Sequence, residues 1–471
     1  MKTYEKGISL SIWTLSWPIF IEVFLQLLVG NIDQLMMSHY SPQAVAAVAN
    51  ANQILNIFIM LIVVMSTATT ILIAQYLGAR NQSKLSEVCT VSLVLNFVFS
   101  SVAAVFFITC HKWIFTWLGI PPETMGDTSL YTTIVAAGLP IQAMYYALVA
   151  VFRGHSLTRI TMYVALVMNI IHVGTNYILI FGHGPIPSLG VLGVSISTWL
   201  SKVIGLLIIV YLFKTLLQLK VSTSYLRPFP WHTVKSLLHI SVPSGGETLS
   251  YQLSQTTIMK MVNILGLTVI NTKVYVYVIA MLCYVYTIAL SNASQVIVGF
   301  LMGAKRQDEV TNRVWHSMFL AIAISVGLAT FFYITSDTVL SVFTTDPEVL
   351  SLAHNVLLVE IFLELGRAVN IVMVGCLQAA GDIRTPMLVG IFGMWLCAVP
   401  LSYLFGIYWG WGLVGIWIAM AADEILRGLL FIYRWYSGNG KKNALLRCSD
   451  IVCLRFYIGD IGTLVKVGLY A

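Results

Sequence analysis

The sequence predicts an all-α integral membrane protein whose twelve transmembrane helices form two six-helix lobes related by an axis along the membrane normal. Composition is the first indication, because 58% of the 471 residues are hydrophobic and 10% are charged, with a mean hydropathy of +0.86. Soluble domains carry roughly a quarter charged residues, so soluble classes are excluded. The other two indications are the recurrence of long apolar stretches and an internal repeat.

Charged and turn residues divide the apolar sequence into the expected spans. A span needs about 20 predominantly apolar residues, and clusters of Gly, Pro and charge mark the connections between spans. The first stretch contains Glu22 and Asp33 and is too long for the core of a signal peptide, so we interpret it as span one. The expected spans cover residues 11–38, 44–77, 88–112, 126–151, 160–181, 191–214, 236–265, 270–301, 314–344, 350–378, 387–407 and 412–436.

Basic residues predict the orientation of these spans. They concentrate in alternate connections, whereas the opposite connections carry acidic residues such as Glu123 and Asp346. By the positive-inside rule, both termini are cytoplasmic, and we expect a multi-pass protein of the cell membrane. The same distribution explains the net charge of +7 without a nucleic-acid partner. The basic connections hold Arg80, Lys84, Arg153, Arg159, Lys220, Arg227, Lys235, Lys305, Arg306, Arg313 and Arg384.

An internal repeat relates the two halves of the chain. Pro18 pairs with Pro243 at a constant offset in residue number (243 minus 18 is 225), and the same offset relates Glu22 to Glu247. Because six spans separate the copies and six is even, both halves should have the same orientation in the membrane. Further pairs at this offset are Met36 with Met261, Ser66 with Ser291, Ala68 with Ala293, Gly78 with Gly303, and Arg159 with Arg384.

The repeat and the connections between spans define the expected domains. Residues 1–214 form the N-terminal lobe, and residues 236–436 form the C-terminal lobe. Residues 215–235, which include two prolines, are a cytoplasmic linker, and residues 437–471 are a cytoplasmic tail to which we assign no function.

Carboxylates inside the spans are the first candidates for a functional site, because charged groups in the hydrocarbon core usually face a protein interior or a watery cavity. Glu22 and Asp33 lie on one face of span one, about 16 Å apart along the axis, so one cavity could contact both. Glu247 is the repeat equivalent of Glu22, whereas Asp33 maps onto Ile258 and is therefore asymmetric. A carboxylate in a cavity of low dielectric can exchange a proton for another cation. Alternatively, Asp33 is a helix-end residue, and the glutamates brace helices kinked by proline.

Other polar residues in the spans form groups at helical spacing. His172 and Asn176 are four apart on one face of span five and are either neutral ligands beside Asp33 or polar links between helices. In span ten, the spacing of Glu360, Glu364 and Arg367 predicts an internal salt-bridge network. Asp423, Glu424 and Arg427 near the last span look similarly paired, and Lys202 and Lys260 either snorkel or line the cavity.

Several segments resemble the multidrug and toxic compound extrusion (MATE) family, over about residues 10 to 436. The resemblance implies two six-helix lobes in a V, a central cavity, alternating access by rocking, and efflux driven by H⁺ or Na⁺. The segments are Asp33–Met36, YLGAR after span two with its copy FLMGAK after span eight, LQAAGDIRTPM at 377–387 with its copy FRGHSLTRITM at 152–162, NYILIFG at 176–182, and GVLGVSIST at 190–198.

The resemblance also implies roles for particular residues. The span-one Asp of the family falls on Asp33, and a cation site in the N-terminal lobe would include His172, Asn176 and Thr198. The span-seven Glu of the family falls on Glu247. A Na⁺ ion, if it is the coupling ion, would bind at Asp33 and Asn176. Many relatives carry a second Asp where this chain has Asn176.

The expected activity follows from these residues and from the resemblance. We expect a secondary active transporter that exports small, cationic, amphipathic organic compounds by H⁺ or Na⁺ antiport, with no other cofactor. Its expected partners are these substrates and the lipid bilayer, and we expect a monomer. Some relatives carry an acidic residue where Arg367 falls, so the sequence leaves a second ion site in the C-terminal lobe open.

Two alternatives remain open from the sequence. A flippase for lipid-linked oligosaccharides, from the same superfamily, would use positive groups such as Arg367, Lys202 and Lys260 to hold a pyrophosphate. A membrane-embedded enzyme would need a nucleophile with a base, or a metal cluster. The sequence has no GxSxG, HExxH or P-loop motif, and its seven cysteines form no CxxC pair, so we expect no catalytic activity and no structural metal.

Overall fold

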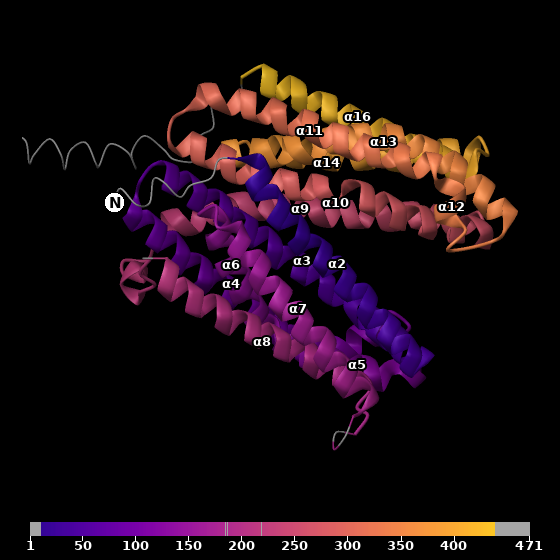
Figure 1. The fold of residues 1–471 in the computed structure, drawn as a ribbon, viewed down its shortest axis with the longest axis horizontal. Coiled ribbons are helices and arrows are strands. Elements are labelled where there is room, and N and C mark those ends of the chain that lie inside the picture. The colour runs from indigo at the N-terminus through magenta and orange to yellow at the C-terminus, as the bar shows by residue number, and fades with distance from the viewer. Residues whose placement is uncertain (1–10, 184, 186, 218, 439–471) are drawn as a thin grey trace, which may run out of the picture.

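The computed structural model describes residues 11–438 apart from 184, 186 and 218. Figure 1 shows two groups of long helices that meet at one end and diverge toward the other. The chain fills one group before it enters the other, so the groups are the two halves of the sequence. The expected tail, residues 437–471, lies outside the described residues from residue 439 onward.

Six spans form the N-terminal lobe, drawn in indigo to magenta in Figure 1. One of them is a bent pair, α5 and α6, whose axes differ by 45°. The bend lies at Gly138, where an added Cβ would lie 2.8 Å from Trp199 Cδ1, so glycine allows the close approach of α8. The helices are α2 (Ile12–Tyr40), α3 (Pro42–Gly78), α4 (Gln82–Trp117), α5 (Pro122–Ala137), α6 (Leu139–Gly154), α7 (Thr158–Phe181) and α8 (Val191–Leu216).

Six further spans form the C-terminal lobe. The linker between the lobes carries a short 3₁₀ turn, η1 (Thr223–Leu226). The span that begins at Arg384 is a continuous helix that contains two π-helical segments. The first segment ends just before Pro400, which has no backbone N–H to donate to the helix. The elements are α9 (Trp231–Ile264), α10 (Leu267–Gly303), α11 (Gln307–Ile334), α12 (Ser336–Leu340), α13 (Pro347–Ala380), α14 (Arg384–Gly393), η2 (Met394–Ala398), α15 (Val399–Ser402), η3 (Tyr403–Tyr408) and α16 (Gly412–Tyr436).

The ninth span ends earlier than the sequence predicts. The expected helix over 314–344 is broken at Thr335, and the five-residue α12 follows. Directly after the break, the Ser336 hydroxyl lies 2.8 Å from His354 Nδ1, which ties the start of α12 to α13.

The helices are those of a multi-pass membrane protein. Among the described residues, eight helices are long and apolar enough to cross a bilayer, and the bent pair of α5 and α6 adds a ninth span. The remaining long helices are α9, α13 and α16, and the last two carry the buried ion pairs of the C-terminal lobe. The predicted fold class, twelve helices in two lobes, is confirmed.

The repeat is visible in the register of the helices. The helices α3 and α10 end at Gly78 and Gly303, which keeps the offset of the repeat (303 minus 78 is 225). At these two positions the backbones touch across the lobes, since a Cβ on Gly78 would overlap the carbonyl oxygen of Phe300 and one on Gly303 would overlap that of Gln75. The Gln75 amide also donates to the carbonyl of Ala379, 2.8 Å away in the other lobe. The lobes are therefore closed at this end.

The first helix of each lobe begins inside the core of the other lobe. Ile12, Leu15 and Ile19 of α2 pack with α10 and α13 residues in the C-terminal lobe. Correspondingly, Leu237 and Ile240 of α9 pack in the core of the N-terminal lobe. This exchange lies at the closed end, where it ties the two lobes together.

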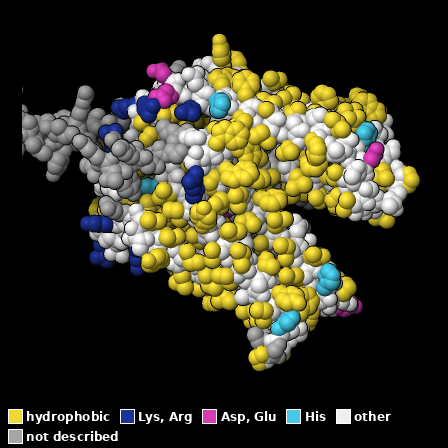
Figure 2. Space-filling view, in the orientation of Figure 1, with side chains coloured by type: hydrophobic (Ala, Val, Ile, Leu, Met, Phe, Trp, Pro, Cys, Tyr) yellow, Lys and Arg dark blue, Asp and Glu magenta, His cyan; other side chains and the backbone are white. Residues whose placement is uncertain are grey.

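The opposite end of the molecule is open. Figure 2 shows a deep notch between the lobes at that end, while Lys and Arg side chains gather at the closed end on this face. Basic residues on the cytoplasmic side are typical of membrane proteins. The distribution is the one expected if the closed end faces the cytoplasm and the notch faces outward.

Candidate functional site

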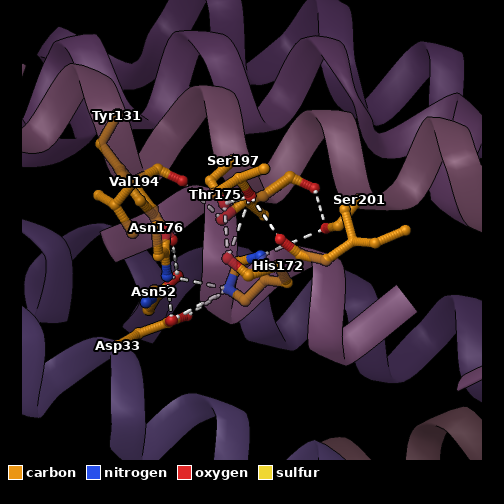
Figure 3. A network of polar contacts seen from close by, with 11 residues as sticks. Asp33, Asn52, Tyr131, His172, Thr175, Asn176, Val194, Ser197 and Ser201 are labelled. Atoms are coloured by element: carbon orange, nitrogen blue, oxygen red, sulfur yellow. Dashed lines mark hydrogen bonds and ion pairs between the residues drawn. The ribbon is translucent and has the colours of Figure 1, made fainter. Parts of the chain in front are cut away.

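Asp33 lies in a polar cluster in the N-terminal lobe, together with two residues of α7 (Figure 3). Its carboxylate accepts a hydrogen bond of 2.5 Å from Asn176 Nδ2, and its two oxygens lie 2.9 and 3.1 Å from His172 Nε2. His172 and Asn176 are buried, whereas the Asp33 side chain is 19% exposed. The spacing of four residues on α7 places both side chains on the face toward α2, so Asp33 is the member of the cluster that solvent can reach.

Two serine hydroxyl groups contact His172 at its Nδ1 atom and its carbonyl oxygen. The Ser201 hydroxyl lies 3.3 Å from His172 Nδ1, and the Ser197 hydroxyl donates to the His172 carbonyl at 2.9 Å. Ser197 and Ser201 are four residues apart on α8, so one helix face supplies both. The sequence analysis missed these serines, although their spacing in an apolar span was a usable signal.

Thr198, Tyr131 and Asn52 lie beside this cluster. The Thr198 hydroxyl donates to the Val194 carbonyl of its own helix at 2.8 Å, so its hydrogen is not available to Asp33. The Tyr131 hydroxyl donates to Asn52 Oδ1 at 3.1 Å. Tyr131 and Asn52 come from α5 and α3, and sequence spacing alone gave no reason to group them with Asp33.

Glu22 lies in a separate, dry environment. Its side chain is fully buried, with Oε2 2.9 Å from Arg153 and 3.1 Å from the Thr161 hydroxyl. The expectation that one cavity contacts both Glu22 and Asp33 is therefore wrong for Glu22. Because Glu22 finds a counter-ion on α6, it belongs to a network that braces α2, α6 and α7.

Span ten carries the ion-pair network that its spacing predicts. Arg367 lies 2.9 Å from Glu360 Oε1 and also pairs with Glu364, and both carboxylates are fully buried. Trp417 Nε1 on α16 donates to Glu360 at 2.7 Å, and the Arg367 guanidinium lies 4.8 Å from the Tyr284 ring centroid. Arg367 is thus neutralised on one side and faces an aromatic ring on the other.

A second network links α16 to α13. Arg427 lies 2.7 Å from both Asp423 Oδ2 and Glu424 Oε1, and the Asn370 amide also donates to Glu424. Glu247 on α9 packs against Gly390 nearby, where an added Cβ would lie 2.9 Å from its Oε1. The chain therefore places a partly exposed Glu247 next to two already paired acids.

Two adjoining cavities lie along this face of the C-terminal lobe. One has a volume of about 610 Å³ and the other about 550 Å³, and both are lined by Tyr251, Tyr277, Tyr284 and Arg367. Glu247 lines the second cavity, which lies deeper along α9. The N-terminal lobe contributes α3 residues to both cavities, Gln53 to the first and Met60, Val64 and Thr67 to the second. The aromatic and polar lining is suited to an organic molecule of drug size.

The comparison with protein families decides what this architecture is. The MatE family model matches residues 18–178 and matches again at residues 243–404. The two matches start at the prolines that define the repeat and keep its offset (243 minus 18 is 225). The chain belongs to the MATE family of transporters. The Asp33 cluster lies inside the first match, and the charged residues of α16 lie outside both.

Individual relatives resemble this MATE protein over nearly its whole length. The uncharacterised transporter YisQ of Bacillus subtilis (strain 168) is 36% identical over 428 residues, which is 91% of this chain and 94% of YisQ. The probable multidrug resistance protein NorM of Thermotoga maritima is 24% identical and covers 92% of this chain and 93% of its own. A solved MATE family transporter of the MOP superfamily in an outward-facing conformation superposes with a TM-score of 0.83 at 20% identity, covering 92% and 96% of the chains.

Proposed function

We propose that this MATE protein is an antiporter that exports small organic compounds across the cell membrane in exchange for protons. The observation that carries the proposal is the contact between the Asp33 carboxylate and His172, at 2.9 Å, within a membrane-spanning lobe. Asp33 is partly exposed, so a proton can reach it from water. The names of relatives such as NorM, a probable multidrug resistance protein, support an export function.

The contacts of His172 satisfy both ring nitrogens, whichever of them carries a hydrogen. In the doubly protonated ring, Nε2 donates to Asp33 and Nδ1 donates to the Ser201 hydroxyl, which itself donates to the Thr198 carbonyl at 2.9 Å. In the neutral ring, Nδ1 accepts from Ser201 instead. In both forms of the ring, each nitrogen has a hydrogen-bond partner.

The donor atoms around Asp33 favour a proton over Na⁺. A hard cation such as Na⁺ prefers several oxygen ligands, by analogy with other hard cations. The Asp33 carboxylate instead contacts nitrogen atoms of His172 and Asn176. The side-chain oxygen of Asn176 is buried without a hydrogen-bond partner. Na⁺ binding would require the Asn176 side-chain amide to rotate so that its oxygen faces Asp33. Proton binding requires only that the contact between Asp33 and His172 be broken.

The open notch supplies the route for exchange. We propose that the closed end, with its basic residues, faces the cytoplasm together with both termini, so the described conformation faces outward (Figure 2). Protonation of Asp33 removes the charge that orients His172 and Asn176, which loosens the tie between α2 and α7. Rocking of the lobes would then separate the contact at Gly78 and Gly303 and open the cytoplasmic side.

The cavities of the C-terminal lobe are the proposed substrate site. Tyr251, Tyr277 and Tyr284 offer flat aromatic surfaces, and Met259 and Met394 offer flexible, polarisable ones. Glu247 supplies a negative charge for the cationic group of an amphipathic substrate. One chain contains both the ion cluster and these cavities, and we propose a monomer as the functional unit.

Dye efflux from proteoliposomes tests the proposal directly. An outwardly directed movement of a rhodamine dye should follow an imposed proton gradient and should be absent with a sodium gradient alone. Transport driven only by sodium would overturn the proton assignment. Absence of transport under both gradients, with a folded and correctly inserted protein, would overturn the antiport function.

A further inference from the structure

We propose that the larger cavity of the C-terminal lobe recognises small organic compounds through an acidic group, such as a carboxylate, that binds beside Lys260 and Lys273. This inference rests on the proposed export function and adds a substrate class to it.

Among the described cations that line this cavity, Lys260 and Lys273 are the two without an ion pair. Arg367 is paired with Glu360 and Glu364, and Arg427 is paired with the acids of α16. Within the described part of the chain, no carboxylate lies within ion-pair distance of Lys260 or Lys273. The Lys273 ammonium approaches Met259 Sδ at 2.9 Å, and a thioether cannot neutralise it.

The fold places both lysines in the wall of one cavity. They line the 610 Å³ cavity, Lys260 from α9 and Lys273 from α10. Lys260 lies one turn before the end of α9 at Ile264, and Lys273 lies less than two turns after the start of α10 at Leu267. Both therefore lie toward the open end of the notch, where a compound leaving the cavity must pass.

The repeat shows that these charges belong to one lobe only. At the offset of the repeat, Lys260 corresponds to Leu35 (260 minus 225) and Lys273 corresponds to Val48 (273 minus 225). Conversely, Asp33 corresponds to Ile258, which is fully buried. The two lobes share a scaffold but carry opposite charge near the open end, so an ion site in one and an acid-binding site in the other are physically distinct.

Neutral polar side chains of the same cavity can also bind an organic acid, and the two carboxylates that line it, Asp423 and Glu424, are paired with Arg427. Gln252, Gln255 and Asn263 present amide groups, which can donate hydrogen bonds to a carboxylate. Tyr277 presents a ring and a hydroxyl to the same cavity. Cations in a concave wall of low dielectric concentrate the electrostatic field, so an anionic group is attracted to this part of the cavity.

Two dyes that differ in one charge provide the test. Rhodamine B carries a carboxylate and a delocalised cation at neutral pH, and its ethyl ester carries the same cation without the carboxylate. Fluorescence polarisation with the purified full-length protein in detergent, without any ion gradient, measures the affinity for each. We expect the wild type to bind the acid at least about fivefold more tightly than the ester, the size of one partly exposed ion pair.

The variants assign that preference to the lysines. Replacing both by glutamine, Lys260→Gln with Lys273→Gln, should abolish the preference while leaving affinity for the ester unchanged within about twofold. Replacing both by arginine should keep it. Lys112→Gln, which removes an exposed cation from the open end of α4, is the matched control and should also keep it.

Two results would overturn the inference. One is equal or tighter binding of the ester by the wild type, and the other is a preference for the acid that persists in the double glutamine variant. Displacement of rhodamine B by farnesyl pyrophosphate but not by excess of a small aromatic carboxylate would also overturn it, in favour of a lipid pyrophosphate. Because the assay uses no gradient, normal binding with failed transport would instead overturn only the antiport function.

Discussion

Asp33 and His172 are 139 residues apart in the chain, yet the carboxylate oxygen of one lies 2.9 Å from Nε2 of the other. The contact joins the first helix of the N-terminal lobe to the fifth span of the same lobe. Since α2 also begins in the core of the C-terminal lobe, a change at Asp33 acts on a helix shared by both lobes. The helix α2 therefore connects the proposed proton site at Asp33 to the closed end of the molecule.

Removal of the Asp33 charge should uncouple transport. Asp33→Asn keeps the size of the side chain and its contact with α7 but cannot carry a proton. We expect proton-driven efflux in proteoliposomes to fall at least about tenfold, with unfolding temperature within a few degrees of wild type. Asp127→Asn, an exposed acid at the start of α5, should transport normally. Undiminished efflux by Asp33→Asn would remove Asp33 from the mechanism.

Replacement of His172 should weaken proton-coupled transport. His172→Gln removes the ring that lies 2.9 Å from the Asp33 carboxylate and 3.3 Å from the Ser201 hydroxyl, so Asp33 loses a positioned partner. We expect initial rates of dye efflux under a fixed proton gradient to fall by about fivefold, as for the loss of one hydrogen bond worth about 1 kcal/mol. A rate equal to that of wild type would show that His172 is not needed to position Asp33.

The pair of Glu22 and Arg153 should stabilise the fold rather than take part in transport. Arg153→Ala leaves Glu22 as a buried, unpaired charge, and we expect a loss of about 3 kcal/mol of stability, measured as a reduced unfolding temperature in detergent. The double variant Glu22→Gln with Arg153→Ala should recover a large part of the loss. If both variants are equally unstable, the ion pair is not the cause.

The glycine contact at the closed end should hold the outward-facing state together. Gly78→Ala or Gly303→Ala places a methyl group against a backbone carbonyl of the other lobe, so α3 and α10 must move apart there. Hydrogen exchange of the segments around residues 75–82 and 300–307 should become faster. Gly327→Ala, where a Cβ meets nothing within 4 Å, should leave exchange unchanged. Unchanged exchange in the Gly303 variant would contradict a closed gate at this contact.

Glu247 should contribute to binding of the cationic part of a substrate. Glu247→Gln removes the charge while its neighbours Asp423 and Glu424 stay paired with Arg427. We expect the affinity for the rhodamine ethyl ester to fall by about fivefold in the polarisation assay. An effect on protein yield alone, with normal affinity in the folded fraction, would make Glu247 a structural residue.

The parts of the site that lie on a single helix could be predicted from the sequence. The spacing of His172 and Asn176 on α7, and of Glu360, Glu364 and Arg367 on α13, follows from 3.6 residues per turn, and the structure shows each set on one face. The partners contributed by other helices, such as Ser201 for His172 and Arg153 for Glu22, were missed because no periodicity links residues of different spans.

The sequence by itself determined the spans, the two-lobe repeat and the asymmetry between Asp33 and Ile258, because hydropathy and register are properties of the linear chain. Only the tertiary structure decided which charges reach a cavity. Glu22 was a candidate for a cavity, but it is buried in an ion pair with Arg153, whereas Arg367 lines both cavities although it is paired with acids of its own helix. The acids that neutralise Arg367 and Arg427 lie within two turns of them on the same helix. Whether a carboxylate of another helix reaches Lys260 or Lys273 depends instead on packing between helices, which no local spacing encodes, and none does so within the described residues.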